Sequence, residues 1–359
     1  MSSAINLRLH NFHQNILISL KFILLRSSKF VFLITEILSI PILRFAGTKV
    51  CLNYNSKYKI DGSGAQLQRI FGLYALAQRY HFDYLHTCIT EVAVHALDPF
   101  QSSEEMIQYL KKLNNAFLLP DSTNESFNYI YEEQSLKLTK LLYCAIKSIL
   151  LKQNILLRVT LPYRLLDIHP DSYEVIKQDL LNWKNGNPNN AKLGCKQIAV
   201  HFRSGVGGMA IQKGEKISRE IHFDYFKEVI DSITSNIPDG NFEITIFTDA
   251  PMQDIEFVPP TEQNTLWSNS PAFNGERIYI LGNDLSRKFD KYLGKYSIEI
   301  GGDPIEAIYK MSSADYLIMG RSSLSYIAGI LNIRGKVYYP ANFWHPPLSR
   351  WIKANISDL

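Results

Sequence analysis

Short apolar runs alternate with amphipathic stretches through the second half of the chain, and this alternation predicts strands and helices in turn. The stretches with helical spacing are residues 222–235, a segment that begins at Asp303, and residues 322–331. The runs typical of strands are residues 197–203, 242–247, 277–281, 297–300, 315–319 and 336–339. Because alternating strands and helices fold into a parallel sheet covered on both faces, the pattern predicts an α/β fold.

The first half of the chain carries the same pattern less regularly. Residues 49–54 are predicted as a strand, a helix runs from a glycine turn through Arg79, and residues 82–87 are a second strand. Residues 98–190 are predicted to be mostly helical. The polar run at 185–190 contains Gly186 and Pro188 and marks the domain boundary. The chain is therefore predicted to have an amino-terminal segment, 1–48, and two domains, 49–190 and 191–359.

Length and composition agree with two globular domains. A chain of 359 residues is too long for one core, and 46% hydrophobic with 20% charged residues is typical of globular proteins. The net charge of +4 and the lack of a dense Lys/Arg tract argue against nucleic acid as a partner, but suit an anionic ligand. The four cysteines are scattered without metal-binding spacing, so they are expected to be reduced and no metal site is predicted.

Residues 1–48 differ from the rest in being rich in Ile, Leu and Phe with interspersed basic residues. The longest nearly apolar stretch, residues 30–43, contains Glu36 and Pro41 and is shorter than the roughly 20 residues that a spanning helix needs. Two interpretations remain open: an amphipathic segment in a membrane interface, or a helical hairpin packed on the body. Lys21, Arg26 and Lys29 favour the membrane surface as a partner, with the location either cytoplasmic or membrane-associated.

The strongest candidate for ligand binding is the end of the strand at 197–203. It brings His201 and Arg203 to the carboxyl edge of the predicted sheet, and a glycine-rich loop with Gly205 follows. Ligands of open α/β sheets bind at that edge, and a planar guanidinium suits a diphosphate. The alternative is that Arg203 is a partner in a structural salt bridge.

A second candidate is the turn Gly62-Ser63-Gly64 between the first strand and the first helix. This arrangement points free backbone N–H groups and the positive end of the helix dipole at an anion. The alternative is a tight connection with no ligand. Asp61, beside the turn, and Asp249, after the strand at 242–247, are candidates for a general base. Their alternatives are a turn former and a cap of the next segment.

Four short motifs occur in one order along the chain and together resemble the GDP-fucose-dependent fucosyltransferases (the α1,2, α1,6 and protein O-fucosyltransferases). The resemblance covers about residues 49–72 and 197–340. The motifs are Gly62-Ser63-Gly64-Ala65-Gln66-Leu67, His201-Phe202-Arg203-x-Gly205, Phe247-Thr248-Asp249, and the segment 311–318 leading into Ser322-Ser323-Leu324-Ser325.

The resemblance implies a GT-B architecture, in which two Rossmann-like domains enclose a cleft. It also implies an inverting glycosyl transfer from a GDP-sugar to a hydroxyl of a glycan or protein acceptor, without a metal or other cofactor. The donor's diphosphate then contacts Arg203, and its guanine or ribose lies near His201. The serines of the 322–325 run, Ser322, Ser323 and Ser325, are placed at the phosphates. Either Asp303 or Glu306 pairs with the guanine edge.

Two departures from the family pattern leave the donor open. Ser204 stands where many relatives have a second arginine, and Tyr326-Ile327 replaces the usual aromatic pair. GDP-fucose is therefore the leading donor only. The alternatives are a GT-B transferase that uses another nucleotide sugar, and a catalytically silent descendant that binds a glycan or a partner.

Overall fold

The computed structural model describes residues 49–57, 61–92, 103–117, 119, 126–176, 194–203, 209–212, 215–218, 221–249, 255–257, 278–280, 285–292 and 294–354. The chain divides into two compact units. The first takes its described residues from 1–59, 69–87 and 119–175, and the second from 60–68, 88–118 and 176–359. The predicted segment 1–48, the boundary at residue 190 and Gly205 lie outside the described residues. Within the described ranges, no helix is long and apolar enough to cross a membrane.

The first unit is built on a four-stranded parallel sheet with the order β2-β1-β4-β3. The strands are β1 (Val50–Tyr54), β2 (Asp83–Leu85), β3 (Tyr129–Ser135) and β4 (Ile155–Leu161). The helices are α3 (Ser63–Tyr80), α5 (Leu138–Leu151), the short α6 (Tyr163–Leu166) and the 3-10 helix η1 (Pro170–Val175). The crossovers through α3 and α5 step across the sheet in the same direction, so right-handed connections put both helices on one face.

Strands β3 and β4 correct the prediction that residues 98–190 are mostly helical. β4 reads ILLRVTL and is largely buried on both faces, and such a continuous apolar run shows no period that separates a strand from a buried helix. β3 is an edge strand with alternating exposure, YIYEEQS, but its exposed positions include Ile130, which blurs the two-residue period. The predicted strands on either side of this region, β1 and β2, are confirmed.

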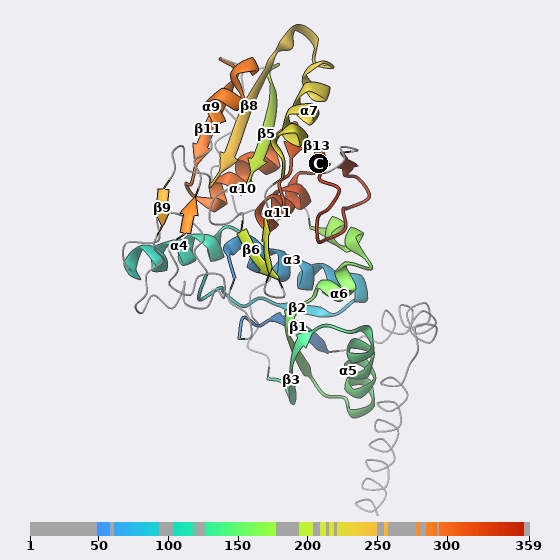
Figure 1. Ribbon diagram of the computed structural model, residues 1–359. Coiled ribbons are helices and arrows are strands. Elements are labelled where there is room, and N and C mark those ends of the chain that lie inside the picture. Colours follow the sequence, from blue (N-terminus) through green and yellow to red (C-terminus); the bar gives the residue numbers. More distant parts are fainter. Residues whose placement is uncertain are drawn as a thin grey trace, which may run out of the picture. The chain divides into compact units, whose positions relative to one another are not determined.

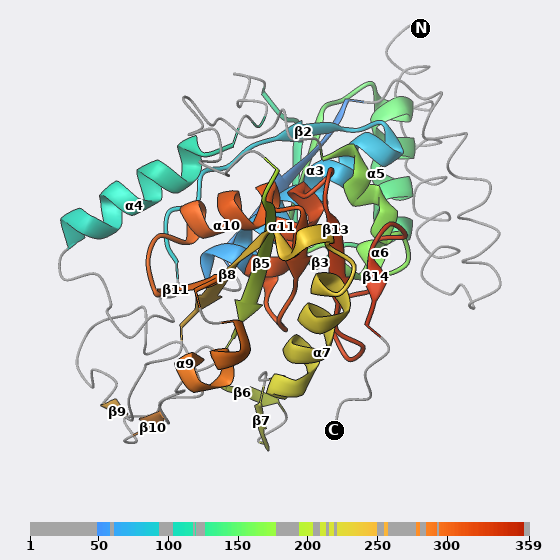
Figure 2. The same cartoon turned by 90° about the horizontal axis from the view of Figure 1, so that it is seen from above.

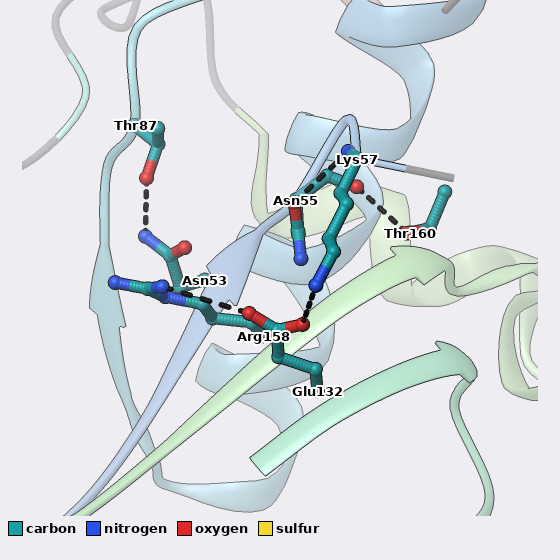
Figure 3. Close-up of polar contacts among 7 residues, drawn as sticks. All are labelled: Asn53, Asn55, Lys57, Thr87, Glu132, Arg158 and Thr160. Carbon is teal, nitrogen blue, oxygen red and sulfur yellow. Dashed lines mark hydrogen bonds and ion pairs between the residues drawn. The ribbon is translucent and has the colours of Figure 1, made fainter. Parts of the chain in front are cut away.

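Side-chain hydrogen bonds tie together the carboxyl ends of β1, β2 and β4 (Figure 3). The buried Asn53 amide donates to the carbonyl of Leu85 at 2.9 Å and to the hydroxyl of Thr87. Thr160 Oγ1 donates to the carbonyl of Asn55 at 2.7 Å. These bonds fix the chain where it leaves each strand and give this edge of the sheet a defined shape.

An ion-pair row continues from Asn53 across the same face of the sheet. Asn53, Arg158 and Glu132 are direct neighbours on β1, β4 and β3, and Glu132 accepts from Lys57 at 2.8 Å. The Arg158 guanidinium lies 3.8 Å from the other oxygen of Glu132, and Figure 3 shows all four side chains on one side of the strands. Half-exposed pairs of this kind contribute little to stability, about 0–1 kcal/mol.

The second unit contains a six-stranded parallel sheet with the order β11-β8-β5-β12-β13-β14 (Figure 1). Its strands are β5 (Lys196–Phe202), β8 (Phe242–Thr248), β11 (Tyr296–Ile300), β12 (Tyr316–Ile318), β13 (Lys336–Tyr339) and β14 (Ile352–Lys353). Two small antiparallel pairs join β6 (Met209–Gln212) to β7 (Glu215–Ser218) and β9 (Ile255–Phe257) to β10 (Ile278–Ile280). The predicted α/β class is confirmed, because both main sheets are parallel.

Helices cover both faces of this second sheet. The helices of this unit are α4 (Ser103–Asn115), which packs at the start of α10, α7 (Phe223–Thr234), α9 (Leu285–Lys288), α10 (Pro304–Ser313) and α11 (Ser323–Leu331), with 3-10 turns η4 (Pro238–Gly240) and η5 (Asp290–Tyr292). Figure 2 shows α7 and α9 on one side of β5 and β8, and α10 on the other. The core on the α7 side includes Ile198, Val200 and Phe202 of β5. Alternation along the strand therefore turns His201 and Arg203 to the opposite face.

Candidate functional site

A cavity of about 190 Å³ in the second unit gathers most of the predicted site residues. It lies where β5 and β8 end and where the helices α3, α10 and α11 begin. Three helix N-termini thus meet one space, and each brings its first backbone N–H groups and the positive end of its dipole. The predicted residues that line it are Asp61, Gly62, Ser63, Gly64, His201, Arg203, Asp249, Ser322 and Ser323.

The contact at the centre of this site joins Arg203 to Ser322. Arg203 Nη1 donates to Ser322 Oγ at 2.8 Å, and the same oxygen accepts from the backbone N–H of Leu324 at 3.2 Å. Ser322 is 2% exposed and caps the N-terminus of α11. Because a hydroxyl oxygen accepts two hydrogen bonds and carries one hydrogen, the Ser322 hydrogen remains to be donated to a further acceptor. The structure thus brings these two predicted residues together, and their roles at a donor stay predictions.

Helix α11 is anchored by an aromatic group at its far side. The Tyr326 ring stacks on Phe343 with 5.5 Å between centroids, and its hydroxyl donates to the carbonyl of Pro346 at 2.8 Å. Trp351 meets the same ring edge-on at 4.9 Å. These contacts fix α11 along its length, so that its N-terminus presents Ser322 and Ser323 to the cavity in a constant position.

His201 is neutral in this environment. Its side chain is buried, and burial, together with the positive charge of Arg203, lowers the pKa of His201 from 6.5 to about 3. Its Nδ1 has no hydrogen-bond partner among the described residues. Gly320 makes this placement possible, because a Cβ there would lie 2.4 Å from the His201 carbonyl oxygen. A neutral imidazole with an unused nitrogen can donate or accept one hydrogen bond at the cavity wall.

The Gly62–Gly64 turn is more than a tight connection. A Cβ on Gly64 would lie 2.7 Å from the backbone nitrogen of Leu324, so the starts of α3 and α11 touch backbone to backbone. The Gln66 amide holds the turn by donating to the carbonyls of Asp61 at 2.8 Å and Glu91 at 2.6 Å. The glycine at position 64 is thus required by close packing, and the packing brings two helix N-termini side by side.

The two general-base candidates, Asp61 and Asp249, both line the cavity. Asp61 Oδ1 also accepts from the backbone N–H of Gly62 at 3.0 Å, which is the turn-forming contact that its alternative interpretation expects. The structure therefore brings the two carboxylates to one space. Their catalytic roles remain predictions.

Three other predicted donor residues lie beside the cavity rather than in its wall. Ser325 is buried, and its hydroxyl contacts the carbonyls of Gly320 at 3.0 Å and Ser322 at 3.1 Å, so its single hydrogen is used within the fold. Asp303 caps α10 by accepting from the backbone N–H of Ile305 at 2.8 Å. Glu306 follows one turn later on the exposed side of the same helix.

Helix α4 supplies two residues that the sequence did not single out. Lys112 pairs with Asp303 and with Glu306, the latter at 3.1 Å. Tyr109 shares a hydrogen bond of 2.6 Å with the hydroxyl of Ser63. Both contacts join residues far apart in the sequence, and only the regular amphipathic spacing of α4 could have suggested that the helix packs on something. Within the described ranges, no group of three or more His, Cys, Asp or Glu side chains could hold a metal ion.

No protein-family model and no curated protein matches this sequence. The chain is similar in structure to E. coli heptosyltransferase WaaC with ADP-2-deoxy-2-fluoro heptose, at 9% identity, 86% and 94% coverage of the two chains, and a TM-score of 0.33. It is also similar to E. coli ADP-heptose lps heptosyltransferase II, at 9% identity, 86% coverage of this chain and 91% of that chain, and a TM-score of 0.36. It is similar as well to fucosyltransferase NodZ from Bradyrhizobium, at 9% identity, 79% coverage of this chain and 93% of that chain, and a TM-score of 0.26. These TM-scores are too low to carry an argument about the fold. The assignment to the α/β class is therefore based on the strand order and register described above.

Proposed function

We propose that the protein is a glycosyltransferase that moves a sugar from a GDP-sugar to a hydroxyl of a glycan or protein acceptor, with inversion at the anomeric carbon. The observation that carries this proposal is the Arg203–Ser322 hydrogen bond in a cavity where three helices begin. A guanidinium, a hydroxyl with a hydrogen to donate, and several backbone N–H groups suit a diphosphate. The order of the four motifs, which resembles that of GDP-fucose-dependent fucosyltransferases, supports the same conclusion.

The proposed reaction needs positive charge next to the donor's leaving group, the nucleoside diphosphate. As the bond from the anomeric carbon to the diphosphate oxygen breaks, its electron pair passes to that oxygen and negative charge grows there. Arg203, the Ser322 hydroxyl and the amides at the starts of α3 and α11 are already held in place to stabilise it. Preorganised donors of this kind are typically worth about 2.7–4 kcal/mol each in the transition state.

The acceptor hydroxyl must lose its proton as its oxygen attacks the anomeric carbon. Asp61 and Asp249 are the carboxylates that line the cavity, and we assign the general-base role to one of them. Separate Asp61→Asn and Asp249→Asn variants decide between the two. Substitution of the general base should lower the rate of transfer by about 10²–10⁴-fold and leave nucleotide affinity unchanged. Substitution of the other aspartate should leave the rate of transfer largely unchanged.

The guanine of the donor is assigned to the start of α10. Gly302 and Pro304, on either side of Asp303, line the cavity, and Asp303 itself lies beside its wall. A carboxylate accepts hydrogen bonds from the N1–H and the 2-amino group of guanine. Independence from metal ions remains a prediction of the sequence resemblance.

A thermal-shift panel of GDP, UDP, ADP and CMP, each with a chelator present, tests the proposal. A ligand that binds only the folded state raises stability, by about 2.7 kcal/mol at 100 times its Kd. We expect GDP to give the largest shift. A larger shift with UDP or ADP would reject the donor base, a strict need for Mg²⁺ would reject metal independence, and no shift with any nucleotide would reject the site.

Transfer itself is then measured with radiolabelled GDP-sugars and mixed glycan and peptide acceptors. Arg203→Ala is compared with Arg334→Ala, an exposed arginine in the same unit that does not line the cavity. Loss of transfer in the first variant alone supports the proposed role of the cavity. Binding of GDP without any transfer would instead favour the catalytically silent alternative.

A further inference from the structure

Helix α4 contacts two walls of the cavity with two side chains one turn apart. Residues three positions apart on a helix share a face, and Tyr109 and Lys112 use that face. Tyr109 reaches Ser63 at the start of α3, and Lys112 reaches Asp303 and Glu306 at the start of α10. All five residues belong to the second unit. The helix thus joins two segments of the cavity wall that the sequence separates widely.

The ion pairs of Lys112 with Asp303 and Glu306 are too exposed to serve the stability of the fold alone. The Lys112 side chain is 48% exposed and Glu306 is 62% exposed, and ion pairs in such surroundings are worth about 0–1 kcal/mol. One ammonium also faces two carboxylates, which leaves a net negative charge next to a site for an anion. Asp303, at 23% exposure, is the more enclosed partner and is held by the backbone N–H of Ile305.

The pair presents a particular pattern of donors and acceptors. The ammonium of Lys112 has three N–H donors, and its two carboxylate contacts leave one for a ligand. The Asp303 carboxylate has about four lone-pair sites, of which Ile305 and Lys112 take two. A donor therefore stands next to acceptors at the start of α10, beside the cavity.

We propose that Lys112 determines the specificity of the site for the donor's base, by donating to the 6-carbonyl oxygen of guanine while Asp303 accepts from N1–H and the 2-amino group. This inference rests on the proposed function and deepens it. Adenine presents an amino group at position 6 and an unprotonated N1, so its edge has the opposite polarity and offers neither charged group a complementary partner. Sites built on hydrogen bonds reject such mismatches strongly.

Tyr109 is a positioning residue for Lys112, because both side chains project from α4. Burial raises the pKa of the Tyr109 phenol, so the hydroxyl remains protonated and available for its bond to Ser63. Its hydrogen bond to Ser63 fixes α4 one turn before Lys112. Tyr109→Phe is therefore expected to weaken the preference for guanine in the same direction as loss of Lys112, by a smaller factor.

The test compares the affinities of the full-length protein for GDP, ADP and inosine diphosphate by calorimetry. Lys112→Met should lower GDP affinity by about 10- to 100-fold, the range expected for one hydrogen bond from a charged group. ADP affinity should change little, so that the preference for GDP over ADP collapses. Lys112→Arg should restore most of the preference, because arginine keeps a charged donor.

Inosine diphosphate tests the contact of Lys112 apart from the full contact of Asp303, since it keeps the 6-carbonyl and N1–H but lacks the 2-amino group. Its affinity should fall with Lys112→Met as that of GDP does. Lys111→Met, on the adjacent exposed position of α4, is the matched control and should bind as the unaltered protein does.

Each contrary result has a separate meaning. An equal loss of GDP and ADP affinity in Lys112→Met would show a merely structural role and overturn the inference, as would an unchanged ratio. If the unaltered protein prefers ADP or UDP, both this inference and the donor assignment fail while the cavity remains a nucleotide site. If it binds no nucleotide, the proposed function itself fails.

Discussion

Arg203 and Ser322, 119 residues apart in the sequence, are joined by a hydrogen bond of 2.8 Å. One residue ends a central strand and the other begins a helix, so the bond holds β5 and α11 at a fixed spacing. Because the guanidinium is already oriented by this contact, a bound anion need not fix it in place. Under the proposed function, this preorganised donor stabilises the negative charge that develops on the leaving diphosphate.

Substitution of Arg203 separates a role in transfer from a role in folding. Arg203→Ala should lower kcat by about 10²–10³-fold, because one preorganised donor is lost, and should shift the melting temperature only slightly. Arg203→Lys should recover little, since an ammonium lacks the planar fork. Steady-state kinetics and calorimetry on the same samples check this, with Arg334→Ala as control. Activity lost only in proportion to stability would assign Arg203 a structural role.

Gly64→Ala tests the contact between the starts of α3 and α11. The added Cβ would lie 2.7 Å from Leu324 N and 2.9 Å from Leu324 Cα, and a backbone cannot give way as a side chain can. We expect a destabilisation of about 1–3 kcal/mol and loss of GDP binding, measured by urea unfolding and calorimetry.

Gly294→Ala is the control for that substitution. Its φ of +79° causes strain worth about 1–2 kcal/mol, but nothing lies within 4 Å of the added Cβ. It should therefore lower stability and leave nucleotide affinity intact. Retention of normal affinity in Gly64→Ala would contradict the close packing of the two helix starts as a requirement of the site.

The burial of His201 predicts a pH dependence of stability. Its pKa is about 3 when folded and about 6.5 otherwise, so between these values the unfolded chain binds the extra proton. Stability should therefore fall as the pH falls through this window, by up to about 1.4 kcal/mol for each pH unit. Above pH 6.5, both states are neutral and the residue contributes no slope.

Urea unfolding between pH 4.5 and 7.5 measures that slope, and His201→Gln removes its source. The difference in unfolding free energy between the two proteins should change with pH below 6.5 and level off above it. Parallel curves across the whole range would mean that His201 binds protons equally in the folded and unfolded states, which contradicts its burial.

Thiol reactivity reports on the core of the first unit. Cys144 is fully buried, and burial raises the pKa of its thiol to about 12, whereas Cys88 is exposed. Because only the thiolate reacts, Cys88 should be labelled first by a disulfide reagent at pH 8, and Cys144 only after unfolding. Mass spectrometry locates the label, and Cys88→Ser should abolish the fast phase. Fast labelling of Cys144 would contradict the packing of α5.

The sequence predicted best where local rules act alone. Asp303 and Ser322 have the residue types that cap helices, and both begin the helices expected of them. The apolar run at 197–203 was correctly predicted as a strand, and the structure brings His201 and Arg203 at its end to the cavity. Strand β4 was missed, because burial on both faces erases the period by which a strand is recognised. Strand β3 was missed because its exposed positions include the apolar Ile130.

Long-range contacts were beyond reach from the sequence. The pairing of Lys112 with Asp303 depends on how α4 packs, and nothing near Lys112 in the sequence distinguishes it from its neighbour Lys111. The approach of Gly64 to Leu324 likewise appears only once both helices are placed. The residue types of the site were therefore predictable, while the contacts that orient them were not.

The contact of Gly64 with Leu324 also sets an order of events during synthesis. At typical ribosomal rates, the glycine turn leaves the ribosome on the order of 10–50 s before Leu324 does. Throughout that interval the start of α3 lacks its contact with α11, and the proposed nucleotide site is incomplete. A chain that stops short of α11 should therefore leave the ribosome with much of its first sheet formed and with no affinity for the donor.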